Sequence, residues 1–125
     1  MKNKILAPIS VGELFDKITI LEIKKDKVTN HTALSNIMLE LSELNSLVPM
    51  MTTQLLDKLK EQLKTINQYI WSLEDDIRSK EKENLFDQRF IELAREIYKS
   101  NDERARIKKL INLETNSLIH EEKVY

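Results

Sequence analysis

Apolar residues recur every three or four positions along most of the chain, which is the period of amphipathic α-helices. The first run begins near Val11, after an extended segment that contains Pro8. Ser10 and Glu13 have the spacing of a capping box, in which the serine accepts a hydrogen bond from an early helical N–H. The apolar positions cover two sides of this helix, so we expect it to be central. They are Val11, Leu14, Phe15, Ile18, Ile20, Leu21, Ile23 and Val28.

A second helix is predicted between Asn30-His31-Thr32 and Pro49, because proline disfavours continuation of a helix. Its apolar positions lie on a single face. They are Leu34, Ile37, Met38, Leu41, Leu44 and Val48.

The most regular pattern runs from Thr53 to about Glu83, where apolar spacings of three and four alternate over three heptads, as in a coiled coil. A helix of this length would measure ~46 Å, whereas a compact domain of this size has a diameter of roughly 35 Å. We therefore predict that it overhangs its domain. The second helix would fold back on it across residues 49–52, and a second copy, most simply in a two-fold dimer, would cover the rest. The predicted interface residues are Leu56, Leu59, Leu63, Ile66, Ile70, Trp71, Leu73 and Ile77.

Two shorter helices are predicted in the C-terminal third. Asp87 is the predicted N-cap of the first, and Ser100-Asn101-Asp102 would break it and cap the second. We thus predict an all-α fold, a helical hairpin or bundle with one long heptad-bearing helix and two shorter C-terminal helices. We expect a single domain over residues 1–125, with a short extended N-terminus (1–10) and a polar C-terminal tail (114–125).

Composition narrows the chemistry. One Gly, two Pro and no Cys leave few sharp turns and exclude disulfides, thiol catalysis and cysteine-containing metal sites. With 20 basic and 21 acidic side chains, the chain lacks the net positive field that attracts nucleic acids or anionic lipids. No apolar run reaches the roughly 20 residues that span a bilayer. We expect a cytoplasmic protein without a cofactor, a metal site or a membrane partner.

Polar residues on the long helix and the C-terminal segment are the candidates for a site. Glu74 and Asp75 could form a general acid–base pair, but an acidic helix face with ion pairs four residues apart is the commoner arrangement. Arg95 could bind a carboxylate or phosphate, or simply pair with a neighbouring acid. The sequence has no nucleophile beside a histidine and no glycine-rich phosphate loop, so activity as an enzyme is left open and is not favoured. The ligand-binding candidates are Asp75, Arg78, Arg95, Tyr98, Asn101, Asp102 and Arg104.

The segment 99–109 has a local charge of about plus three. Two short helices that meet at Ser100-Asn101-Asp102 could imitate a helix-turn-helix, with Arg104 and Lys108 in a DNA groove. The turn lacks glycine, and the acidic stretch 74–87 could neutralise this segment within the chain. We therefore regard nucleic-acid binding as the third hypothesis.

Five segments resemble a family of small proteins of unknown function from bacteria, notably marine ones, and cyanophages. These segments are Ile9 to Lys24, Ile70 to Arg78, Phe90 to Tyr98, Asn101 to Lys108 and Glu121 to Lys123. The resemblance covers nearly the whole chain and implies no activity. The polar residues that match the family's pattern are Glu13, Asp16, Lys17, Thr19, Asp75, Arg78, Arg95, Tyr98, Asn101, Asp102, Arg104 and Glu122.

The leading hypothesis is a homo-oligomeric interaction or assembly module that joins its copies, or an unidentified protein partner, through the heptad seam. The alternative is a protein that binds a small anionic molecule, or a small enzyme, with its site at a helix interface. That alternative requires a concave pocket that joins Arg78, Arg95 and Arg104.

Overall fold

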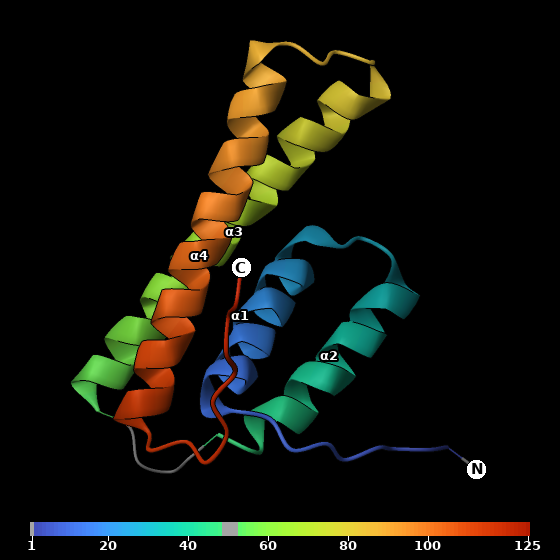
Figure 1. Cartoon of the computed structure of the whole chain (residues 1–125). Coiled ribbons are helices and arrows are strands. Elements are labelled where there is room, and N and C mark those ends of the chain that lie inside the picture. The colour runs from blue at the N-terminus through green and yellow to red at the C-terminus, as the bar shows by residue number, and fades with distance from the viewer. Residues whose placement is uncertain (1, 49–52) are drawn as a thin grey trace.

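A computed structural model describes residues 2–48 and 53–125, which contain four α-helices and no β-strand (Figure 1). The all-α prediction is confirmed. In this part of the chain no helix is both long and apolar enough to cross a membrane. The helices are α1 (Val11–Lys27), α2 (His31–Asn45), α3 (Gln54–Lys82) and α4 (Gln88–Glu114).

Each helix begins after a residue whose side chain accepts a hydrogen bond from the backbone N–H three positions on, the usual N-cap arrangement. The starts predicted near Val11, at Thr53 and after Asp87 are therefore confirmed. Glu13 does not complete the capping box, because its carboxylate binds Lys108 on α4. The four N-caps are Ser10, Asn30, Thr53 and Asp87.

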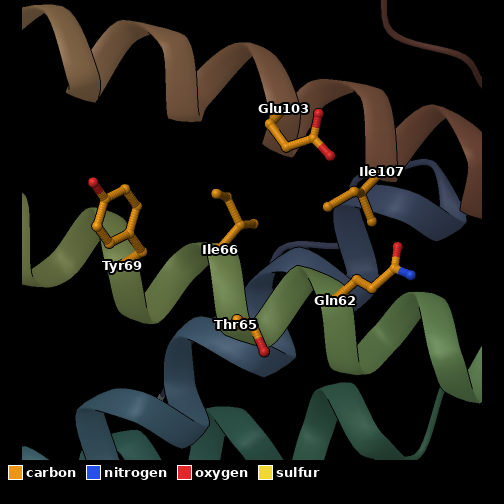
Figure 2. A pocket seen from close by; sticks show the side chains of 6 residues that line it. All are labelled: Gln62, Thr65, Ile66, Tyr69, Glu103 and Ile107. Atoms are coloured by element: carbon orange, nitrogen blue, oxygen red, sulfur yellow. The ribbon is translucent and has the colours of Figure 1, made fainter.

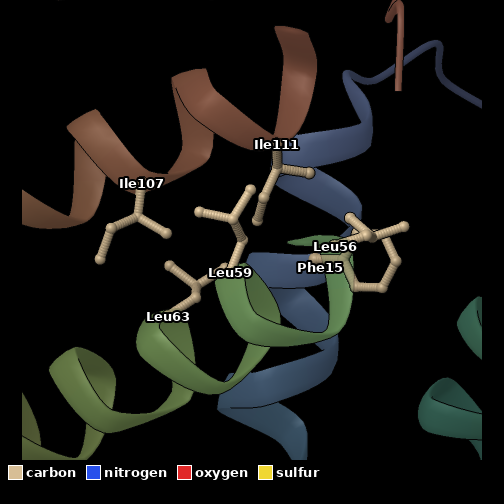
Figure 3. Packing of buried hydrophobic residues seen from close by; sticks show 6 residues of the cluster. All are labelled: Phe15, Leu56, Leu59, Leu63, Ile107 and Ile111. Carbon is tan, nitrogen blue, oxygen red and sulfur yellow. The ribbon is translucent and has the colours of Figure 1, made fainter. Parts of the chain in front are cut away.

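Helix α1 lies between two apolar clusters, as its two-sided pattern predicts. On one side Phe15 packs with side chains of α3 and α4 (Figure 3). On the other side Ile18 and its neighbours pack against Leu41 of α2. The first cluster consists of Phe15, Leu56, Leu59, Leu63, Ile107 and Ile111, and the second of Leu14, Ile18, Leu21 and Leu41.

The long helix α3 forms its hairpin with α4, not with α2. The two helices run antiparallel along their whole length, whereas α2 packs on α1 alone among the described elements (Figure 1). The predicted pairing of α2 with α3 is therefore wrong, and the connection predicted over Pro49–Thr52 lies outside the described residues. The reason is amphipathicity: α2 has one apolar face, and α1 provides a matching face for it.

The heptad seam of α3 is buried within the chain by α4 and α1. Four leucines of the seam are at most 4% exposed: Leu56, Leu59, Leu63 and Leu73. The isoleucines Ile66, Ile70 and Ile77 are half-buried. The 29 residues of α3 span about 44 Å, and α4, with 27 residues, is nearly as long. Much of the seam is thus covered within the chain. Dimerisation through the residues that remain half-buried, Ile66, Ile70 and Ile77, stays a prediction.

Helix α4 is continuous, so the predicted division into two shorter helices is wrong. Ser100 is buried, with 7% of its surface exposed. Asn101 donates a hydrogen bond to the carbonyl of Ile97, and Asp102 pairs with Lys123 at 3.3 Å. Asn101 and Asp102, which resemble a helix start, thus find partners while the helix continues.

Two asparagines end the helices of the hairpin. Asn84 and Asn116 have φ angles of 56° and 51°, in the left-handed region that asparagine tolerates better than most residues. In both turns the next N–H bonds to a carbonyl five residues earlier, the Schellman arrangement. The turn at Asn116 sends the C-terminal segment back toward α1 (Figure 1).

At Gly12 the backbone of α1 lies close to that of α4. A Cβ atom built on it would lie 2.5 Å from the carbonyl oxygen of Lys108 and 2.9 Å from Oδ1 of Asn112. Both distances are shorter than van der Waals contact. The chain's only glycine therefore stands where the two helices cross.

Candidate functional site

A buried carboxylate lies at this crossing. Asp16 of α1 is 1% exposed, and its two oxygens accept hydrogen bonds from Nε and Nη2 of Arg104, with the Nε–Oδ1 distance at 2.9 Å. Asn67 of α3 donates a third hydrogen bond to Oδ1, at 3.0 Å. Three helices are thus joined through one carboxylate.

Further polar groups extend this network. Asn67 also donates to Oγ1 of Thr19, whose hydroxyl donates to the backbone carbonyl of Asp16. Lys108 binds Glu13 at 2.6 Å and lies 3.8 Å from Asp16. We call the five side chains Asp16, Thr19, Asn67, Arg104 and Lys108 the polar network.

Burial alone would raise the pKa of Asp16. The hydrogen bonds from Arg104 and Asn67, together with the positive charges of Arg104 and Lys108, outweigh this effect and lower the pKa below its ordinary value. In turn, the hydrogen bond to Asp16 raises the pKa of Arg104. The pair is therefore ionised at neutral pH, with its charges matched inside the protein.

The N-terminus of α1 is hydrogen-bonded to the end of α4 and to the segment that follows it. Ser117 Oγ accepts from the N–H of Val11, and Asn112 Oδ1 accepts from the N–H of Gly12 at 2.6 Å. Ser10 donates to the carboxylate of Glu121, which places a negative charge at the positive end of the helix. The first-turn donors are thus engaged by the protein itself.

A cavity of about 320 Å³ lies beside the polar network, between α1 and α3. This volume is at the lower end of the range typical of small-molecule sites, which is roughly 300–1,000 Å³. Arg104 extends from the network into its lining, and its side chain is 29% exposed. Arg78 pairs there with Glu74 at 3.3 Å. The lining residues are Ile20, Asn67, Ile70, Trp71, Glu74, Asp75, Arg78 and Arg104.

The structure divides the predicted ligand-binding residues into two groups. Asp75, Arg78 and Arg104 line the cavity, and Asn101 accepts a hydrogen bond from Arg104 at 3.3 Å. Arg95, Tyr98 and Asp102 are exposed and do not line it. The cavity therefore joins Arg78 and Arg104 but not Arg95, so the predicted pocket with all three arginines is not the one found here.

Trp71 also lines this cavity, although the heptad pattern suggested it as an oligomer contact. Its side chain is half-buried, and the ammonium of Lys27 lies 5.7 Å from the ring centroid. This is within the distance of a cation–π interaction. The cavity therefore includes a ring that already attracts a cation.

The basic segment 99–109 is largely neutralised within the chain. Arg104 and Lys108 point toward α1, and Arg106 pairs with Glu103 at 2.6 Å. The acids that neutralise it lie on α1 and on α4 itself, not in the predicted stretch 74–87. The predicted helix-turn-helix is wrong, because α4 is continuous, and Arg104 and Lys108 are paired with acids of α1.

A second hollow of about 380 Å³ lies between α3 and α4, on the face away from α1 (Figure 2). Its polar groups have partners nearby: Tyr69 donates to Glu96, and Glu103 accepts from Arg106. Ile66 and Ile107 form much of the remaining wall. This hollow has no cluster of opposed charges comparable to that of the first cavity.

Sequence reasoning singled out Asp16 and Thr19 only through the family resemblance, and it missed Asn67. Asn67 lies four residues after Leu63 and three before Ile70, and Asp16 and Thr19 stand among the apolar positions that cover two sides of the first helix. A short polar side chain at a core position usually has a hydrogen-bond partner, and this was the available signal. Which partner it finds depends on the packing of three helices.

Across residues 2–48 and 53–125, no group of three or more acidic or histidine side chains is arranged to hold a metal ion. The protein is all-α, and a cavity lined by charged side chains lies beside its buried ion pair. Residues 5–125 match the model of DUF6165, a family of unknown function, and the chain belongs to this family. The search of curated proteins found no match, and neither did the search of solved structures.

Proposed function

We propose that this protein binds a small molecule that carries a carboxylate or phosphate group, in the cavity between α1 and α3. The observation that carries the proposal is the position of Arg104, which is held by a buried carboxylate and lines the cavity together with Arg78. Guanidinium groups bind carboxylates and phosphates through paired N–H donors.

Arg104 is already oriented for such contacts. A guanidinium has five N–H donors, and Arg104 uses three of them for Asp16 and Asn101. Because the buried pair fixes the side chain, little conformational entropy would be lost when a ligand binds. This is the usual advantage of a site whose polar groups are supported from behind.

The proposal concerns binding and not catalysis. Asp16, the buried carboxylate beside the cavity, has a lowered pKa and fully engaged oxygens, so it is a poor proton acceptor. The assembly role predicted from the heptad seam has weaker support, because α1 and α4 cover much of that seam within the chain. Small-ligand binding is therefore our first proposal.

Trp71 provides the test, because it is the only tryptophan and lines the cavity. Its fluorescence should change saturably when the protein is titrated with compounds from a panel of small dicarboxylates, free amino acids, N-acetyl amino acids and sugar phosphates. Binding should also raise the unfolding temperature, since a ligand specific for the folded state stabilises it.

Arg78→Gln should weaken the binding of any such compound about tenfold, the effect of losing one charged hydrogen bond. The Arg78 side chain is 78% exposed, so folding should be unaffected. Arg89→Gln, an exposed arginine outside the cavity, is the matched control and should bind as the wild type does. No saturable binding across the panel, or equal weakening by both variants, would contradict the proposal.

A further inference from the structure

The charges around the cavity match neither an anion nor a cation alone. Arg78 and Arg104 face a lining that also includes Glu74 and Asp75. Arg104 is paired with Asp16, and Arg78 with Glu74. A simple anion such as inorganic phosphate would approach two carboxylates, and a simple cation would approach two guanidinium groups.

Asp75 is the acidic group of the lining that has no partner among the described residues, since no ion pair or hydrogen bond of its side chain occurs there. It lies one helical turn after Trp71 and three residues before Arg78, so the three side chains share one face of α3. An exposed carboxylate beside an indole ring is well suited to an ammonium group.

Trp71 supports the same assignment. The ammonium of Lys27 lies 5.7 Å from its ring centroid, so the indole ring is placed where a cation–π contact can form. Arg104, whose remaining N–H donors suit a carboxylate, projects from α4 at the side of the polar network. Ile20 and Ile70 add apolar wall to the same hollow.

We infer that the ligand is a zwitterion, a small molecule with a carboxylate and an ammonium group, of the size and type of an α-amino acid with an aliphatic side chain. Its carboxylate binds Arg104 and Arg78, its ammonium binds Asp75 beside Trp71, and its aliphatic part contacts the isoleucines. The cavity has the volume of about ten water molecules in the liquid, which matches the size of such small compounds. This inference rests on the proposed function and specifies the ligand class of the same site.

The test compares three forms of the same aliphatic amino acids, which differ in charge while the side chain stays constant. The probes are the free L-amino acids leucine, isoleucine and valine, their N-acetyl derivatives, which are anions, and their amides, which are cations. Trp71 fluorescence and the unfolding temperature are measured for each. We expect free amino acids to bind at least about tenfold more tightly than either single-charge form, because each form loses one charged contact.

Asp75→Asn separates the ammonium contact from the carboxylate contact. It should weaken the binding of the free amino acid about tenfold and leave the binding of the N-acetyl derivative unchanged. Asp76→Asn is the matched control: it neutralises the neighbouring carboxylate, which is exposed and outside the cavity lining. Both substitutions are at exposed positions of α3, so the folded fraction should be unaltered.

The other outcomes distinguish this inference from the function on which it rests. If the N-acetyl derivatives bind as tightly as the free amino acids, the zwitterion assignment is overturned while carboxylate binding stands. If amides bind as tightly as free amino acids, carboxylate recognition is overturned as well. If no amino-acid form binds but a sugar phosphate or a dicarboxylate does, the zwitterion assignment alone is overturned.

Discussion

The two ends of the α3–α4 hairpin are held together by different interactions. At the base, where α1 crosses, Leu63 and Ile111 are fully buried and Asp16 joins three helices. At the tip, beyond the reach of α1, Leu85 and Phe86 are 45% and 57% exposed, although Phe86 still packs edge-on against Phe90. The same pair of helices is thus an interior element at one end and a surface element at the other.

The ion pairs differ in the same way. At the tip, Lys80 pairs with Asp87 and Arg89 with Glu92, and the acids are about half exposed. Exposed pairs of this kind contribute little to stability, because water and salt screen them. At the base, removal of either partner leaves an uncompensated charge away from water, which costs far more. Position in the fold, more than the number of ion pairs, determines their energetic importance.

Asp16→Ala should have the largest effect. It removes the acceptor of Nε and Nη2 of Arg104 and one of the two acceptors of Asn67, and should lower the free energy of unfolding by about 3 kcal/mol. Urea denaturation followed by circular dichroism would measure this change. Asp76→Ala on the exposed side of α3 should change the free energy by less than about 0.5 kcal/mol. Equal effects of the two substitutions would remove the distinction between buried and exposed carboxylates.

Gly12→Ala should destabilise by about 2 kcal/mol, because the added methyl group would overlap the backbone of α4. Helix propensity alone predicts the opposite, a gain of up to about 1 kcal/mol. The sign of the change in unfolding free energy therefore decides whether α1 and α4 approach as closely as the structure indicates. A more stable variant would mean that they do not.

The free energy of unfolding should decrease at acidic pH, because the ion pair at the base of the hairpin is lost. The folded-state pKa of Asp16 lies below its ordinary value, so the unfolded chain binds more protons as the pH drops. The contribution of the ion pair is complete above about pH 5 and is lost as the pH falls through and below about 4. Denaturation midpoints of the wild type and Asp16→Asn across this interval should converge toward low pH. Parallel curves would assign the acid sensitivity to the exposed carboxylates Asp87 and Glu103, whose pKa values are also lowered by their pairing.

Arg89→Gln at the tip should have the smallest effect, less than about 0.5 kcal/mol in the free energy of unfolding. Its pairs with Glu92 and Glu96 are solvent-exposed and 3.5 and 3.9 Å long. Urea denaturation followed by circular dichroism would measure this change in the free energy of unfolding. A loss comparable to that of Asp16→Ala would show that the tip is energetically as important as the base.

Much of the helical structure could be predicted from local signals. The starts at Ser10, Thr53 and Asp87 follow from capping residues, and the two apolar sides of α1 correctly indicated a central helix. The predicted break at Ser100-Asn101-Asp102 is wrong, because Asn101 bonds to a carbonyl of its own helix and Asp102 pairs with Lys123, so the helix continues through them. Local chemistry alone does not distinguish the two situations.

The candidate site could be predicted only in part. Asp75 and Arg78 were recognisable because they lie within one turn of each other on α3. Arg104 joins them through the antiparallel return of α4, a relation between positions 26 residues apart that no local pattern contains. Arg95, which is closer in sequence to Arg78, is exposed and outside the cavity because it lies on a different face of α4.

The amino-acid sequence alone determined that this chain is helical and which faces of its helices are apolar, because periodicity and capping act over a few residues. Only the tertiary structure decided which helix covers the heptad seam. An apolar stripe can be buried equally well by a neighbour in the chain, by a distant segment or by a second copy. The tertiary structure likewise decided that Asp16, Asn67 and Arg104 meet, since a buried carboxylate requires partners but does not specify where in the chain they lie.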